Sequence, residues 1–152
     1  LGADAEGREP DGAATPVAPS VVVRFIVRVL APFILVFAAY VILNGHITPG
    51  GGFQGGTMIG ALIIALTLVL DDRASAALLP GRPIEVLQVI APLTFIVVGA
   101  VGLTVWGDYL YFPREPSLRW VAEVMLVLIE AGIGAGGAIV FARVFRLMAG
   151  RP

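Results

Sequence analysis

Four long apolar segments constrain this chain more than any other feature of its sequence. They run from about residue 21 to 43, 53 to 70, 84 to 106 and 118 to 141. A bilayer core of about 30 Å is crossed by ~20 apolar residues in a helix, because lipid offers the backbone no hydrogen bonds. The second segment carries no charge, and the first carries only Arg24 and Arg28 near its start. The sequence therefore predicts an all-α, polytopic membrane protein with four transmembrane helices.

The composition favours the same class of protein. Of the 152 residues, 58% are hydrophobic and 14% are charged. A soluble domain has roughly 45–50% apolar and about 25% charged residues. The excess of apolar residues in this chain must therefore face lipid or other subunits. A net charge of −1 provides no basic surface for nucleic acid. The absence of cysteine and the single histidine exclude thiolate chemistry and histidine clusters, and we expect no cofactor.

The first twenty residues differ in composition from the rest of the chain. They are rich in alanine, glycine, proline and acidic residues, and cannot bury enough apolar area to offset the entropy lost on ordering. We therefore predict a disordered acidic tail over 1–20 and a four-helix transmembrane domain over 21–148. Eight arginines flank the expected helices on the side of the termini and the second loop, and two lie in the third loop. The positive-inside rule then places both termini in the cytoplasm.

A glycine-rich turn joins the first two predicted spans. Its residues are Pro49, Gly50, Gly51, Gly52, Phe53, Gly55 and Gly56. Proline cannot continue a helix, and the glycines permit backbone angles that other residues avoid. The pattern is consistent with a broken helix entry whose free N–H groups point at an anion or at a partner's carboxylate. We expect Phe53 to dock the turn into a neighbour.

Small residues also recur at helical spacing. Gly52, Gly56 and Gly60 share one face of the second span, where another helix can approach closely, so plain packing is one interpretation of this stripe. In the turn, His46 has two interpretations. It could exchange protons at the outer mouth of a proton route, or it could be a loop histidine that donates a hydrogen bond.

Two carboxylates lie within the last span. Glu123 and Glu130 are seven residues apart and share a helix face, which Gly134 and Gly137 continue. Glu130 lies roughly 18 Å into the span, near the midplane of the bilayer. A charged carboxylate there costs at least ~2.5–3.5 kcal/mol, so it is paired, protonated or in a wet cavity.

Both acids are therefore candidates for ion translocation, and Glu130 also for transient binding of Na+. The alternative is an ion pair with another subunit, or a permanently protonated acid. Glu85 lies at the cytoplasmic entrance of the third span. It is a further candidate for translocation. The alternative is a solvated or salt-bridged residue, with Arg82 close in sequence.

The segment around the turn resembles a known family. The run from Asn44 to Gly56, within the stretch 28–65, is similar to the MnhB family, a family of subunits of the Mrp-type Na+/H+ antiporters. The stretch 128–134 resembles that family's Glu-x-Gly-x-Gly segment in the last helix. The resemblance extends over roughly 21–148.

This resemblance implies an accessory subunit rather than an enzyme. The host complex would be a secondary active transporter in a bacterial plasma membrane, exchanging Na+ for H+, with other subunits and lipid as partners. The family pattern implies that Pro49 and Phe53 are functionally sensitive. Two alternatives remain open: a purely structural or assembly subunit, and the homologous subunit of a complex I-like membrane-bound hydrogenase.

Overall fold

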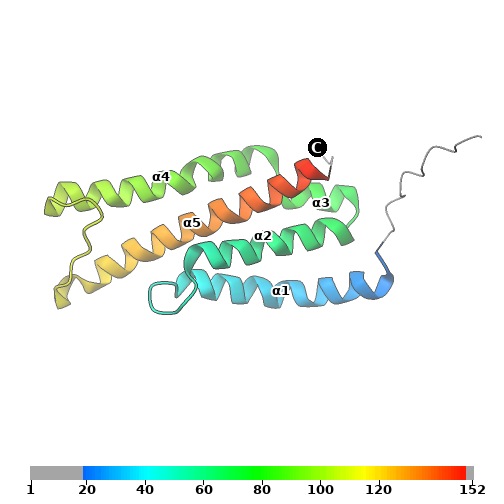
Figure 1. Cartoon of the computed structure of the whole chain (residues 1–152), viewed down its shortest axis with the longest axis horizontal. Helices are drawn as coiled ribbons and strands as arrows, with labels where there is room; N and C mark the ends of the chain where they lie inside the picture. Colours follow the sequence, from blue (N-terminus) through cyan, green and yellow to red (C-terminus); the bar gives the residue numbers. More distant parts are fainter. Residues whose placement is uncertain (1–18, 150–152) are drawn as a thin grey trace, which may run out of the picture.

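The computed structural model describes residues 19–149 as a bundle of helices (Figure 1). The elements are α1 (Val21–Leu43), α2 (Gly51–Val69), α3 (Asp72–Leu78), α4 (Gly81–Trp106), the 3-10 turn η1 (Pro116–Leu118) and α5 (Arg119–Met148). Within residues 19–149, four helical segments are long and apolar enough to cross a membrane, which confirms the predicted fold class. The tail predicted over 1–20 lies outside the described residues, except for Pro19 and Ser20.

The boundaries of the helices differ in places from the prediction. Helix α1 has the predicted bounds, and the hydroxyl oxygen of Ser20 caps it by accepting a hydrogen bond from the N–H of Val23. Helix α4 begins three residues early, at Gly81, and α5 continues past the predicted end at 141 to Met148. The short helix α3 is an addition to the predicted elements. It lies between Asp71, its N-cap, and Pro80, in a segment too short to show helical periodicity.

The long helices follow one another in the order α1, α2, α5 and α4 (Figure 1). Helix α2 lies between α1 and α5, and within residues 19–149 helix α4 packs against α5 and no other long helix. This arrangement leaves large apolar side chains uncovered, among them Phe25, which is 67% exposed, and Val36, which is 70% exposed. Such surfaces face lipid or other subunits, because no soluble protein exposes this much contiguous apolar area.

Glycines allow α2 to approach both of its neighbours closely. A Cβ atom added at Gly56 would overlap the backbone of Gly134 in α5, and one added at Gly60 would lie 2.9 Å from Cβ of Phe141. On the opposite side of α2, a Cβ atom at Gly55 would lie 2.8 Å from the carbonyl oxygen of Ala38 in α1. The main chains themselves are in contact, and dispersion between closely packed backbones holds helices together in lipid.

The connection between α4 and α5 folds back onto α4. The ring of Tyr109 covers Gly99, and the N–H of Leu110 donates a hydrogen bond to the carbonyl oxygen of Gly99 at 3.4 Å. Below this connection, Val98 of α4 packs with Met125 and Ile129 of α5 in a small apolar core. These contacts fix the α4–α5 pair at the end of the molecule opposite α3 (Figure 1).

The glycine contact between α2 and α5 generates a prediction for stability. Gly56→Ala places a methyl group against the main chain of Gly134, which cannot move aside as a side chain could. We expect the free energy of unfolding of the variant to be lower by about 1–3 kcal/mol, as at other overpacked sites, and we expect the variant to melt at a lower temperature in detergent. Gly137→Ala is the matched control, because its Cβ atom would meet only Phe53, at 4.0 Å. Equal melting temperatures for the two variants would contradict the close backbone contact between Gly56 and Gly134.

Candidate functional site

The turn between α1 and α2 is closed by one carbonyl group. The carbonyl oxygen of Asn44, the C-cap of α1, accepts hydrogen bonds from the N–H of Ile47 at 3.0 Å and of Thr48 at 2.9 Å. It also accepts one from the hydroxyl of Thr48 at 2.8 Å. Pro49 comes next and has no N–H to continue the helix, so the chain must reverse there.

The chain enters α2 through two glycines in unusual conformations. Gly50 has φ 141° and Gly51 has φ 74°, values that favour glycine over residues with a Cβ atom. Gly50 occupies the N-cap position of α2, where serine, threonine or aspartate would normally supply an acceptor oxygen. The first N–H groups of α2 therefore need an acceptor from elsewhere in the molecule.

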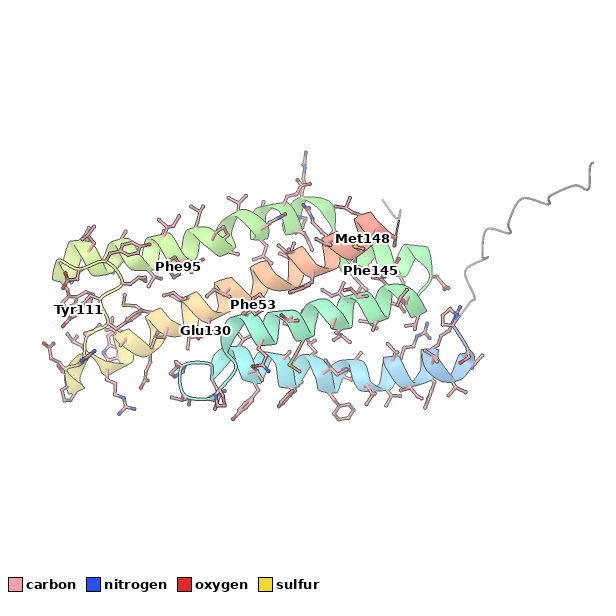
Figure 2. The ribbon with its side chains drawn as sticks, viewed as in Figure 1. Phe53, Phe95, Tyr111, Glu130, Phe145 and Met148 are labelled. Atoms are coloured by element: carbon pink, nitrogen blue, oxygen red, sulfur yellow. The ribbon has the colours of Figure 1, made fainter. Side chains whose placement is uncertain are left out.

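Glu130 of α5 supplies that acceptor. Its carboxylate oxygen Oε2 accepts a hydrogen bond from the N–H of Gly52, although the two residues are 78 positions apart. Figure 2 shows Glu130 beside the start of α2, close to Phe53. The positive end of the α2 dipole also stabilises a negative charge at this point, so the carboxylate acts as the missing N-cap.

Two glycines make room for this carboxylate, and a third makes room for the main chain of the same residue. A Cβ atom added at Gly45 would lie 2.9 Å from Cδ of Glu130, and one at Gly51 would lie 2.8 Å from its Oε2. A Cβ atom at Gly52 would overlap the main-chain carbonyl of Glu130. The glycine-rich motif therefore encloses a carboxylate, which is one of the two kinds of group that the sequence suggests for the free N–H groups, and this carboxylate belongs to the same chain.

The depth of the site differs from the expectation. The sequence predicts Glu130 near the midplane and the turn at the outer end of the spans, but the two are in contact and share one level. In Figure 1 the turn stops short of the ends of α4 and α5. Eleven residues of α5 lie beyond Glu130, from Arg119 onward, which is about 16 Å of helix at 1.5 Å per residue.

The other predicted acids do not join this site. Glu123, whose side chain is 47% exposed, pairs with Arg119 one turn away on α5 at 3.0 Å. Near the start of α4, Oε1 of Glu85 lies 3.9 Å from Nη2 of Arg143, so its ion-pair partner is on α5 and is not Arg82, the arginine close in sequence. In the sequence-based prediction, Arg143 serves only to orient the helices in the membrane. An arginine within an apolar helix is as unusual as a glutamate, and this signal could have indicated the Glu85–Arg143 pair.

The remaining residues of the turn differ in how far they are buried. His46 lies in the turn with its Nδ1 atom buried, and this atom has no hydrogen-bond partner among the described residues. Phe53 is 61% exposed, with its ring centroid 6.2 Å from that of Phe141, and Pro49 is exposed as well. An exposed aromatic ring next to Gly137 provides a surface on which another apolar helix can pack.

The Gly52–Glu130 interaction leads to a prediction for amide exchange. Glu130→Ala removes the acceptor, so we expect the amide proton of Gly52 to exchange with solvent faster. We also expect the free energy of unfolding to fall by about 0.5–2 kcal/mol, as is typical when an N-cap is removed. Hydrogen exchange of the purified protein, read by mass spectrometry over 44–56, measures this. Glu123→Ala serves as the control, since its ion pair is exposed and local. Unchanged exchange in Glu130→Ala would show that the carboxylate does not cap α2.

Comparisons with known proteins agree with this architecture. Residues 22–145 match the family model described as a domain related to the MnhB subunit of Na+/H+ antiporters. A Na+/H+ antiporter subunit of Bacillus subtilis is 34% identical over 116 residues, which cover 70% of this chain and 81% of that protein. An uncharacterised protein of Methanocaldococcus jannaschii is 30% identical over 112 residues, which cover 74% of this chain.

A solved structure has the same fold. It is the membrane-bound sulfane sulfur reductase, an archaeal respiratory membrane complex, with a TM-score of 0.59 and 27% identity over 84% of this chain. The chain spans 59% of that solved chain and 42% of the length of the archaeal relative. Since the family model covers most of residues 19–149, the chain belongs to the MnhB family of antiporter-subunit domains.

Proposed function

We propose that this protein is an accessory membrane subunit of a multisubunit Na+/H+ antiporter, and that Glu130 and the α1–α2 turn form part of the ion path. The observation that carries the proposal is the carboxylate of Glu130 bound to the start of α2, between helices that can cross a membrane. The relatives named as Na+/H+ antiporter subunits support the kind of complex. In it this chain acts by secondary active transport and has no enzymatic activity of its own.

The position of the turn supports a hydrated path. Beyond the turn, α4 from 93 to 106 carries no charge, and α5 carries only the Arg119–Glu123 pair before Glu130. The turn contains the polar residues Asn44, His46 and Thr48. It therefore lies at the level of segments of α4 and α5 that are themselves apolar enough to be surrounded by lipid. Irregular backbone at membrane depth is tolerated where protein buries it or where it lines a water-filled cavity.

The carboxylate keeps one oxygen free for chemistry. Oε2 of Glu130 is bonded to Gly52, and Oε1 makes no hydrogen bond to any residue in 19–149. A proton or a sodium ion can bind at Oε1, since both favour carboxylate oxygen. Either one neutralises the charge and weakens its attraction to the α2 dipole. Ion binding at Glu130 is thereby coupled to the conformation of the turn.

Other subunits have to complete any path. The helices form the row α1, α2, α5 and α4, and the exposed apolar faces of α1 and α4 require cover by lipid or protein. We place the complex in a bacterial plasma membrane, which the relative from Bacillus subtilis supports. We place both termini of this chain in the cytoplasm, the orientation that the arginine distribution favours.

Two specific observations favour alternatives. The backbone contacts of Gly56 and Gly60 with α5, and the capping of α2, are also what a purely structural or assembly subunit needs. The similarity to a chain of the sulfane sulfur reductase complex favours the homologous subunit of a respiratory, hydrogenase-type assembly. The proteins that co-purify in mild detergent distinguish an antiporter from such an assembly.

An exchange assay tests the ion path. Glu130→Gln keeps an acceptor for Gly52 but cannot bind a proton or hold a negative charge, so we expect Na+/H+ exchange in membrane vesicles to fall by at least about tenfold, as for loss of a proton-transfer group. Glu123→Gln, on the same helix, is expected to retain most activity. Normal exchange by Glu130→Gln in an intact complex, judged on native gels, would favour the structural subunit.

A second substitution tests the turn. Pro49→Gly leaves Glu130 in place but removes the residue that ends the helical geometry before Gly50. We expect exchange activity to decline more than the amount of protein inserted in the membrane, which immunoblots of membrane fractions measure. An equal decline in activity and in inserted protein would indicate that Pro49 contributes only to folding.

A further inference from the structure

A cleft separate from the Glu130 site lies at the opposite end of the bundle. It has a volume of about 430 Å³ and is formed by α3, the first turn of α4 and the last turns of α5. Its lining residues are Ala76, Leu79, Gly81, Ile84, Arg143, Arg146 and Leu147. In Figure 1 this end holds α3 and the final turns of α5, away from the α1–α2 turn.

Two arginines line this otherwise apolar cleft. The guanidinium of Arg146 donates from Nη2 to the carbonyl oxygen of Ser75 at 2.7 Å, and its Nε is buried without a hydrogen-bond partner among the described residues. Arg143 donates from Nη1 to the side-chain oxygen of Gln88 at 2.8 Å, and its Nη2 lies 3.9 Å from Glu85. Among the side chains that the structure describes, Glu85 is the acid paired with Arg143, while the lining of the cleft itself contains two arginines and no acid.

The position and lining of the cleft match a phospholipid. It lies at the start of α4 and the end of α5, two helices long and apolar enough to cross a membrane, and lipid head groups meet a protein at the ends of such helices. Ile84 and Leu147 provide apolar walls of the cleft, and Leu147, next to the last residue of α5, is 80% exposed. Gly81 leaves the cleft open, since a Cβ atom added there would meet nothing within 4 Å.

We propose that this cleft binds the head-group phosphate of an anionic phospholipid. The guanidiniums of Arg143 and Arg146 donate to the phosphate oxygens, with which arginine forms strong, directional pairs. The acyl chains leave the cleft along Ile84, toward the middle of the spans. A basic pocket between membrane helices is the kind of site that holds an anionic head group. The bound lipid would tie α3 and α4 to the end of α5, independently of any ion movement at Glu130.

The test measures bound lipid directly. The full-length protein is purified in mild detergent from membranes that contain phosphatidylglycerol, and retained phospholipid is quantified by mass spectrometry. Arg146→Gln is expected to lower retained phosphatidylglycerol about fivefold, the effect of one basic residue at an anionic surface. Gly81→Phe is expected to lower it similarly by filling the cleft while both guanidiniums remain. Arg82→Gln is the matched control, because Arg82 is exposed at the same end and does not line the cleft.

Three results would overturn the proposal. The first is an equal loss of lipid in Arg146→Gln and Arg82→Gln, which would indicate a diffuse surface charge. The second is thermal stabilisation by inorganic phosphate in phosphatidylcholine vesicles that equals stabilisation by phosphatidylglycerol vesicles. The third is a photo-crosslinker at position 147 that captures a protein subunit instead of lipid. If Gly81→Phe fails to fold, the comparison of Arg146→Gln with Arg82→Gln still decides the question.

Discussion

The hydrogen bond between the carboxylate of Glu130 and the N–H of Gly52 is the interaction on which the rest of this structure depends. A helix that starts at membrane depth without a side-chain cap leaves N–H groups that lipid cannot satisfy. A lone carboxylate at that depth is equally unfavourable. Placing the carboxylate at the helix start resolves both problems at once, and it requires the absence of side chains at Gly45, Gly51 and Gly52.

This interaction also determines how the helices are arranged. Glu130 fixes the α1–α2 hairpin on α5 at a level short of the ends of α4 and α5 (Figure 1). Gly56 and Gly60 then continue the contact along α5 by backbone packing, while α4 lies on another side of α5. The helices thus form a row in which the polar α1–α2 turn lies beside an apolar part of α5. The outer faces of the row are apolar and exposed, and partner proteins or lipid can cover them.

Much of the fold was predictable from the sequence because the signals are local. Hydropathy alone located α1 with its bounds, and the Pro49–Gly52 run predicted an irregular entry into α2. The partner of that entry was not predictable, since Gly52 and Glu130 are 78 residues apart and no local pattern connects them. Likewise, Arg143 rather than Arg82 pairs with Glu85, because the packing of α4 against α5 brings residue 143 level with residues 85 and 88.

The most direct measurement of this central interaction is the distance between the amide nitrogen of Gly52 and the carboxyl carbon Cδ of Glu130. Solid-state NMR dipolar recoupling between ¹⁵N and ¹³C measures it in the full-length protein in lipid. We predict a coupling that corresponds to about 4 Å or less, the separation set by one N–H···O bond. The absence of measurable coupling between these two atoms, in a sample whose helices are intact, would contradict the capping of α2 by Glu130.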